Sequence, residues 1–220
     1  MISIRLDTGM QDGISIKTTT CYISGDHGNN NKVYRVKMEK IVAKVLRGSD
    51  ADHMYEYNSC PGTCPVCGNR LSDIPNPLFR LRKKKGDVFG TYDLYQIVSS
   101  KFKMFCEEQG YPNLSFLELE SSKGFYIFNP NEIYRLDYHR RKVQFLNKRE
   151  CCGSYDEIIG AVPSYKEKGW IFQENDFIRR SEYLFGSYRE KTPLIIVGLE
   201  TAAKMKQYGI SGIYFRNVFE

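Results

Sequence analysis

The sequence predicts an α+β fold made of two related strand-helix-strand halves with antiparallel or mixed sheets. Three observations predict it: an internal repeat, a cysteine-rich turn before each copy of the repeat, and alternating apolar residues through much of the remaining chain. The chain has 220 residues, 41% of them hydrophobic and 14% aromatic. That is enough apolar surface for one sizeable core or two small ones.

The repeat aligns residues 97–116, "IVSSKFKMFCEEQGYPNLSF", without a gap on residues 196–215, "IVGLETAAKMKQYGISGIYF". Each copy begins with a short apolar strand, continues with a helix of about three turns that ends at a glycine, and closes with a second alternating strand. We interpret the two copies as an internal duplication. The matched residues are Ile97 and Ile196, Val98 and Val197, Gly110 and Gly209, and Phe116 and Phe215.

The cysteine-rich turns and the repeat together divide the chain into three segments. Residues 1–55 form an N-terminal segment rich in predicted strand. Residues 56–148 contain the first cysteine turn and the first half, and residues 149–220 contain a shorter cysteine turn and the second half.

The N-terminal stretch "MISIRLDTGMQDGISIK" places acids and glycines where a signal peptide needs a continuous apolar block. Apolar runs elsewhere also fall short of the roughly 18 residues that span a membrane. We therefore expect a cytoplasmic protein without a membrane partner. In that reducing compartment, seven irregularly spaced cysteines favour metal binding or catalysis over disulfides.

Cys64 and Cys67 lie in the turn "CPVCG", the spacing with which two thiolates reach one metal ion. Gly68 follows the second cysteine and permits the positive φ that such a turn requires. A thioredoxin-type redox pair would open a helix, whereas here prolines follow at positions 75 and 77. The turn therefore predicts half of a tetrahedral zinc site.

Further cysteines complete this site in one of two ways. "ECCG" supplies Cys151 and Cys152, but Arg149 stands where a full second CxxCG would have its first cysteine. We prefer the set that uses Cys152 without Cys151, because adjacent cysteines rarely reach one ion together. An eroded site, in which the cysteines are free thiols without a metal ion, is a further alternative. The preferred ligands are Cys60, Cys64, Cys67 and Cys152. The alternative set is Cys64, Cys67, Cys151 and Cys152.

Four sulfur ligands leave a zinc ion no open position, so the expected zinc is structural and bridges the two halves. The chain also lacks a Walker loop, a GxGxxG and an HExxH motif. We therefore expect no catalytic residues and no enzymatic activity. An undetected hydrolase remains an alternative.

The charge balance is mildly basic, with 32 basic and 26 acidic residues. Two basic runs would suit phosphate contacts, but both have the alternating pattern of exposed strands and turns. Nucleic acid is therefore the less favoured partner, and a zinc-ribbon nucleic-acid-binding module is the alternative function. Its contacts would be Arg80, Arg82, Lys83, Lys84, Lys85, Arg140 and Arg141.

Over about residues 55–218 the order of motifs is similar to a family of bacterial proteins. The motifs are "CPVCGNRLS", "KGDVFG", "IVSSKFKMF", "G(x)3LSF", "ECCG", "KGWIFQENDF", "PLIIVG" and "GISGIYF". In this order they resemble the double-CxxCG immunity proteins encoded beside polymorphic toxins. Arg149 departs from the pattern, and the first 55 residues have no counterpart in it.

The resemblance implies a non-enzymatic immunity protein that binds a cognate secreted antibacterial toxin and occludes its active site or substrate surface. The net charge of +6 favours a toxin with a neutral or acidic face, such as an ADP-ribosyltransferase. Sixteen tyrosines and thirteen phenylalanines exceed what small sheets need inside, so we expect many aromatic side chains at the surface as interface anchors.

Overall fold

The computed structural model describes residues 2–11, 14–23, 39–56, 60–82 and 85–220. The chain divides into two compact units, Met1–Lys40 and Ile41–Glu220. In the first unit β1 (Ile2–Gln11) pairs with β2 (Ile14–Ile23) as an antiparallel hairpin, with Ile2 opposite Ile23. Among the described residues, no helix is long and apolar enough to cross a membrane.

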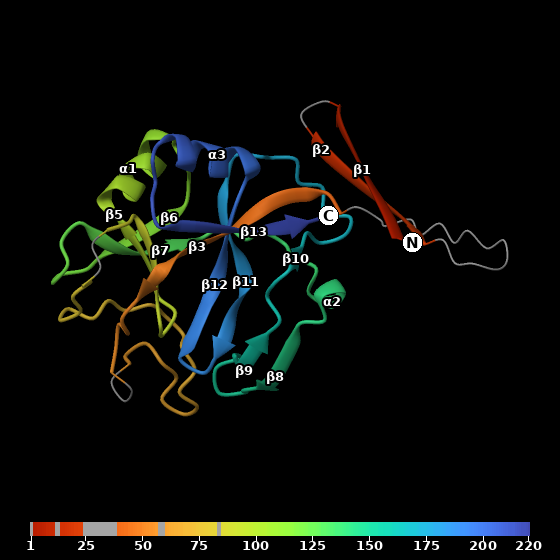
Figure 1. Ribbon diagram of the computed structural model, residues 1–220. Coiled ribbons are helices and arrows are strands. Elements are labelled where there is room, and N and C mark those ends of the chain that lie inside the picture. The colour runs from red at the N-terminus through yellow and green to blue at the C-terminus, as the bar shows by residue number, and fades with distance from the viewer. Residues whose placement is uncertain (1, 12–13, 24–38, 57–59, 83–84) are drawn as a thin grey trace. The chain divides into compact units, whose positions relative to one another are not determined.

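The described residues of the second unit form three helices and the remaining strands (Figure 1). Its helices are α1 (Ser100–Glu108), α2 (Tyr138–Arg141) and α3 (Leu199–Gln207). Its strands are β3 (Ile41–Ala51), β4 (Val88–Thr91), β5 (Gln96–Ser99), β6 (Leu114–Glu118), β7 (Phe125–Pro130), β8 (Gln144–Lys148), β9 (Tyr155–Ile159), β10 (Ser164–Tyr165), β11 (Ile178–Ser187), β12 (Glu190–Val197) and β13 (Ile213–Phe219).

These strands form one 11-stranded sheet, ordered β6-β7-β5-β4-β3-β12-β11-β9-β8, with β13 against β3 and β10 against β13. Most neighbours are antiparallel, whereas β3 with β4 and β10 with β13 are parallel. The sheet is therefore mixed, and the predicted α+β class is confirmed. One sheet runs through residues 56–148 and 149–220, so strand pairing joins these two segments.

The predicted order of strand, helix and strand is confirmed in both segments. The first is β5-α1-β6 and the second is β12-α3-β13. The Ser99 side chain caps α1 by accepting the N–H of Phe102, and Gly110 and Gly209 follow the two helices with positive φ.

In each segment a third strand lies between the two strands of the segment and pairs with both: β7 between β5 and β6, and β3 between β12 and β13. Residues that the repeat aligns pair with the same position of this third strand. Ile127 of β7 lies opposite both Ile97 of β5 and Leu117 of β6. Val45 of β3 lies opposite the two matching residues of the second segment, Ile196 and Arg216. The third strand follows its segment in the first half and precedes it in the second. Residues 41–51, which the sequence places in the N-terminal segment, therefore belong to the main sheet.

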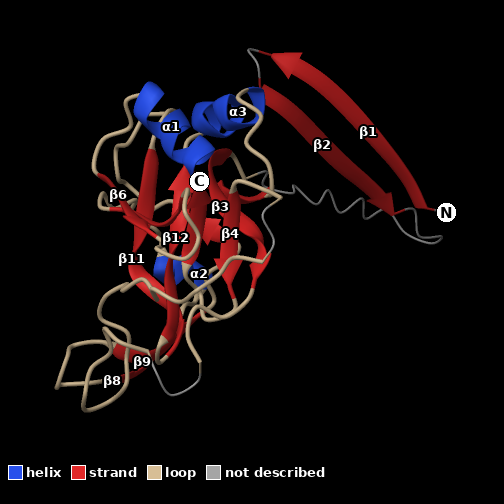
Figure 2. Ribbon diagram, turned by 90° about the vertical axis from the view of Figure 1, so that its left-hand side faces the viewer, coloured by secondary structure: helices blue, strands red, loops and turns tan. Residues whose placement is uncertain are grey.

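Helices α1 and α3 lie side by side over one end of the sheet (Figure 2). Phe102 and Phe105 of α1 and Met205 of α3 are fully buried against sheet residues such as Val98 and Val197. Two further buried clusters lie along the sheet, one around Tyr134 and Ile196 and one around Phe89 and Ile127. The core thus holds the helices at one end and leaves the cysteine turns in loops away from it.

Candidate metal centre

The first cysteine turn is held by its own backbone. The N–H of Cys64 donates to the carbonyl of Asn69 at 2.8 Å, and the N–H of Gly68 donates to the carbonyl of Cys64 at 2.9 Å. Gly68 has φ of +73°, as the sequence predicts for this position. The bridge between Thr63 and Arg70 closes the turn at its base.

The second turn connects β8 and β9 and has the same hydrogen bonds. The N–H of Arg149 donates to the carbonyl of Ser154 at 2.7 Å, and the N–H of Gly153 donates to the carbonyl of Arg149 at 2.7 Å. Gly153 has φ of +71°. Arg149 therefore occupies the place of Cys64, Cys152 the place of Cys67, and Cys151 the place of Val66.

The two turns bring four cysteines together: Cys64, Cys67, Cys151 and Cys152. Their sulfurs all lie within 4.8 Å of one another, with 3.7 Å between Cys64 and Cys151 and 3.6 Å between Cys67 and Cys152. A tetrahedral zinc ion with sulfurs at about 2.3 Å would space them about 3.8 Å apart. The cluster could therefore hold one metal ion, with two ligands from each half.

These four cysteines are the alternative ligand set, and Cys60 of the preferred set is not among them. The sulfur of Cys60 lies outside the four-cysteine cluster, 3.5 Å from the hydroxyl of Tyr95. The preference rested on adjacent cysteines rarely sharing an ion. Because position 149 is arginine, the second turn brings its other sulfur from Cys151, and the adjacent pair does reach one site.

Asn69 joins the sulfurs to the buried polar groups behind them. Its side chain is fully buried, and its amide donates to the Cys67 sulfur at 3.3 Å and to the Asp156 carboxylate at 3.1 Å. Its carbonyl oxygen accepts from the Lys191 ammonium at 2.6 Å. One amide therefore contacts a ligand sulfur, an acid and a cation.

Arg149 and Asp156 form a bidentate ion pair on the second turn. The guanidinium donates to the carboxylate through Nε at 2.8 Å and through Nη2 at 2.6 Å. The Asp156 side chain is 1% exposed. Arg149 is the main cause that holds the pKa of Asp156 below its usual value; desolvation opposes it and Asn69 assists. At the position where the first turn has Cys64, the second turn therefore has a side chain that stabilises the turn through Asp156.

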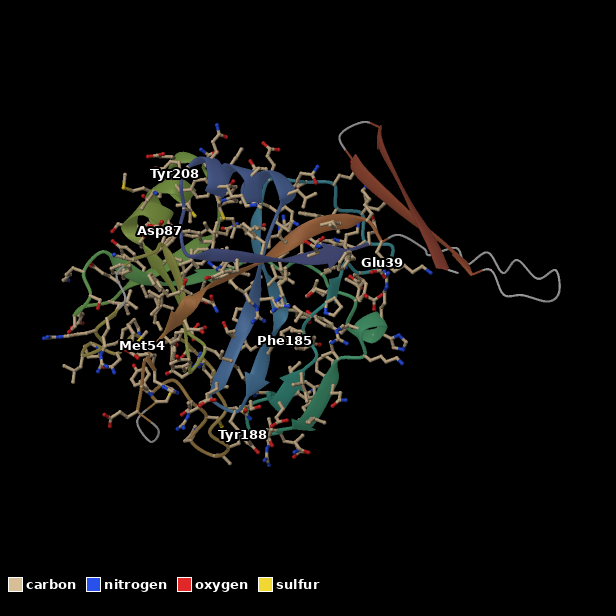
Figure 3. The ribbon with its side chains drawn as sticks, viewed as in Figure 1. Glu39, Met54, Asp87, Phe185, Tyr188 and Tyr208 are labelled. Carbon is tan, nitrogen blue, oxygen red and sulfur yellow. The ribbon has the colours of Figure 1, made fainter. Side chains whose placement is uncertain are left out.

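The turn between β11 and β12 ties both cysteine turns together through Tyr188. Its carbonyl accepts the N–H of Arg70 at 3.2 Å, and its N–H donates to the carbonyl of Asp156 at 2.7 Å. The Arg70 guanidinium is buried and donates to the carbonyl of Lys191 at 2.8 Å. Figure 3 labels Tyr188 at the end of the unit where β8 and β9 lie.

The thiols differ strongly in acidity. The backbone N–H of Asn69 is the main cause that lowers the pKa of Cys67 to about 6. Desolvation and the sulfurs of Cys67 and Cys64 raise the pKa of Cys151 to about 12. Four thiols this close cannot all ionise alone, whereas a divalent cation would hold all four as thiolates and release protons on binding.

Three side chains of this centre carry no motif in the sequence: Asn69, Asp156 and Lys191. The position of Asn69 directly after "CPVCG" could have predicted its role, because its side chain can turn back and donate to the Cys67 sulfur. Lys191 lies far along the chain and reaches the centre only through the pairing of β12 in the sheet.

The fold and the centre define an α+β protein with a four-cysteine cluster shared between two turns. Comparison with protein-family models, with curated proteins and with solved structures found no match.

Proposed function

We propose that this chain is a zinc-stabilised immunity protein that binds a cognate antibacterial toxin and covers its active site or substrate surface. One observation carries the proposal: two turns from different halves present four sulfurs to one point. A tetrahedral ion held there has no position left for water or substrate. The centre suits stabilisation of a binding surface rather than catalysis.

The ion we propose is zinc. Four sulfurs in tetrahedral spacing favour zinc or iron over magnesium and calcium, which prefer oxygen. Zinc would hold all four clustered sulfurs as thiolates, which like-charge repulsion otherwise opposes. It would also fix the first turn against the β8–β9 hairpin, whose other described links are hydrogen bonds such as that of Asn69 with Asp156.

We also propose that the two strand-helix-strand segments are related by duplication. The gapless alignment and the matched pairing around Ile127 and Val45 support this. The similar backbone of the two cysteine turns supports it independently. The order of turn, segment, turn and segment is the order that the family resemblance implies.

The proposed toxin-binding surface surrounds the cysteine turns. Val66 is 78% exposed and Leu71 is 52% exposed on the first turn, and Tyr188 is 47% exposed beside both turns. Most of the aromatic side chains that the structure describes are buried or half-buried instead: Trp170 stacks on Phe172 at 4.6 Å, and both pack edge-on to buried Tyr134. The expected surplus of surface aromatics is therefore small, and these exposed apolar residues are the better candidates.

Co-expression with the toxin domain encoded by the neighbouring gene tests the proposal. We expect rescue of growth and a complex that persists in high salt, because apolar contacts are screened little. Leu71→Asp and Tyr188→Ala should weaken both rescue and complex. Tyr214→Ala, which removes a 61% exposed tyrosine from β13, is the matched control. Absence of rescue and of a complex with the wild-type chain would refute the immunity function.

The nucleic-acid alternative predicts binding that falls steeply with salt. Arg80 and Arg82 line an open cavity of about 1010 Å³ with His53 and Asp52, and Arg82 lies 3.4 Å from the Asp52 carboxylate. Arg140 and Arg141 instead contact Tyr165 and Val162. Lys83 and Lys84 lie outside the described residues, and Lys85 is exposed. The two basic runs thus have separate local contacts, which favours the protein-binding proposal.

A further inference from the structure

We propose that Lys191 is a positioning residue of the metal centre, which neutralises part of the negative charge of the metal-bound thiolates and orients Asn69 toward Cys67. The inference rests on the metal site proposed above. It goes beyond that site because it assigns a role to a buried cation that supplies no ligand atom.

Lys191 is 2% exposed, and lysine is seldom buried without an anionic partner. Its ammonium donates to the side-chain oxygen of Asn69 at 2.6 Å and to the backbone carbonyl of Tyr155. Both acceptors are neutral. The cation must therefore be balanced by charges further away, since two neutral acceptors satisfy its hydrogen bonds and leave its charge uncompensated.

The charged groups around Lys191 indicate that the cysteine sulfurs compensate its positive charge. Asp156 is the carboxylate that the Asn69 side chain connects to Lys191, and Arg149 already pairs with it through two hydrogen bonds. Burial lowers the pKa of Lys191, and the charges of Asp156, Cys152, Cys67 and Glu157 oppose that effect, so two of the four opposing groups are sulfurs of the cluster. A divalent ion with four thiolates carries a net charge of about −2, so the loaded centre supplies the missing anion.

The hydrogen bond from Lys191 to Asn69 also fixes the orientation of the Asn69 amide. A primary amide can be placed in two orientations, and only one aims its N–H groups at the sulfur. Because Lys191 donates to the Asn69 oxygen, the amide nitrogen faces Cys67 and Asp156. Partners that orient the surroundings of a ligand typically change metal affinity about 10- to 100-fold.

Zinc affinity is measured by competition with a chromophoric chelator for wild type and three variants. Lys191→Met removes the charge and keeps the length of the side chain, and Lys191→Arg keeps the charge. Lys168→Met removes one charge from an exposed lysine and is the control. We expect Lys191→Met to lose about 10-fold or more in affinity, Lys191→Arg to lose less, and Lys168→Met to match wild type.

Two measurements separate this role from a purely structural one. Cobalt bound to Lys191→Met should keep the absorption of a four-thiolate site, which shows that all ligands remain. The free energy of unfolding should fall in the metal-loaded variant and stay equal or rise in the metal-free one, because an uncompensated buried cation has been removed.

Three outcomes would overturn the inference. The first is equal zinc affinity in Lys191→Met and wild type. The second is an equal loss of zinc affinity in Lys191→Met and Lys191→Arg, which would indicate a steric role. A wild-type chain that binds no zinc would overturn the metal site and this inference with it. Wild-type zinc binding combined with an unaffected Lys191→Met would leave the proposed metal site intact and refute only the role of Lys191.

Discussion

At the scale of single residues, the metal centre depends on which cysteine completes it. Cys60 and Cys151 are the two candidates for the fourth sulfur, and they have different surroundings. Cys60 lies beside the Tyr95 hydroxyl, whereas Cys151 lies 3.7 Å from the Cys64 sulfur. A zinc ion in the cluster can use only the second of these two sulfurs without a rearrangement of the first turn.

We predict that Cys151→Ser lowers zinc affinity strongly and that Cys60→Ser leaves it unchanged. A serine hydroxyl is a much poorer zinc ligand than a thiolate, so three sulfurs remain in Cys151→Ser and the fourth position is open to water. Zinc content after purification, together with chelator competition, measures this. A loss of zinc in Cys60→Ser but not in Cys151→Ser would favour the other ligand set.

At the scale of elements, local signals predicted the parts of the fold that depend on neighbouring residues. The helices that end before Gly110 and Gly209 were predicted from helical spacing and from the positive φ that a terminal glycine permits, which a few residues determine. The place of β3 between β12 and β13 could not be predicted in this way. Its partners lie roughly 150 to 180 residues further along the chain, and alternating apolar residues do not say which strand pairs with which.

In the candidate site, too, features that depend on neighbouring residues could be predicted from the sequence, and features that depend on distant contacts could not. "CPVCG" predicts its own turn because its hydrogen bonds are local. The contribution of Lys191 depends on β12 reaching the turn, and the choice of Cys151 depends on how the β8–β9 hairpin meets the first turn. Both are consequences of the assembled sheet, which spacing within one motif does not encode.

Helix α3 begins differently from α1, and the reason is steric. Ser99 caps α1 with its side chain, whereas Gly198 stands at the same place before α3 and makes no such bond. A Cβ on Gly198 would lie 1.9 Å from the carbonyl oxygen of Asn175 and 2.4 Å from its carbon. The backbone of the segment before β11 therefore occupies the space that a capping side chain would need.

We predict that Gly198→Ala destabilises the fold by about 1–3 kcal/mol, the usual cost of inserting a methyl group into a packed site. The φ of Gly198 is −62°, so the cost comes from the contact with Asn175 rather than from the backbone angle. Gly90→Ala is the control, because its Cβ would meet only the Gln96 side chain at 4.0 Å. Denaturant unfolding measures both, and equal stability of the two variants would contradict this account.

At the scale of the whole 41–220 unit, hydrogen bonds connect the two strand-helix-strand segments away from the cysteine cluster. Asp87 before β4 accepts the backbone N–H and the hydroxyl of Ser211, both at 2.8 Å, in the turn between α3 and β13. Asp176 before β11 accepts the hydroxyl of Tyr111 at 2.6 Å in the turn between α1 and β6. Figure 3 labels Asp87 near the helices. These links and the apolar core hold the helix end without any of the four clustered cysteines.

Among the described residues, 60–72 and 149–154 of the two cysteine turns belong to none of the three buried apolar clusters. Cys64, Asn69 and Asp156 are buried there, but the turns around them are loops, and Val66 and Leu71 are exposed. The proposed zinc would supply there what apolar packing supplies at the helix end. The stability of the unit should therefore be unevenly distributed, with the cysteine end dependent on metal and the helix end independent of it.

We predict that removing the metal with a chelator under reducing conditions loosens the cysteine end alone. Amide hydrogens in residues 64–70, 149–156 and 188 should exchange faster, because their hydrogen bonds are among turns that only the ion and a few polar contacts fix. Amides of α1 and α3 should stay protected, since Phe102, Phe105 and Met205 are fully buried in a core that contains no ligand. Hydrogen exchange with mass spectrometry resolves the segments, and Cys60→Ser carried through the same treatment controls for thiol chemistry outside the cluster. Uniform loss of protection across the unit would show that the metal is needed for the whole fold, and unchanged exchange in the two turns would show that they hold without it.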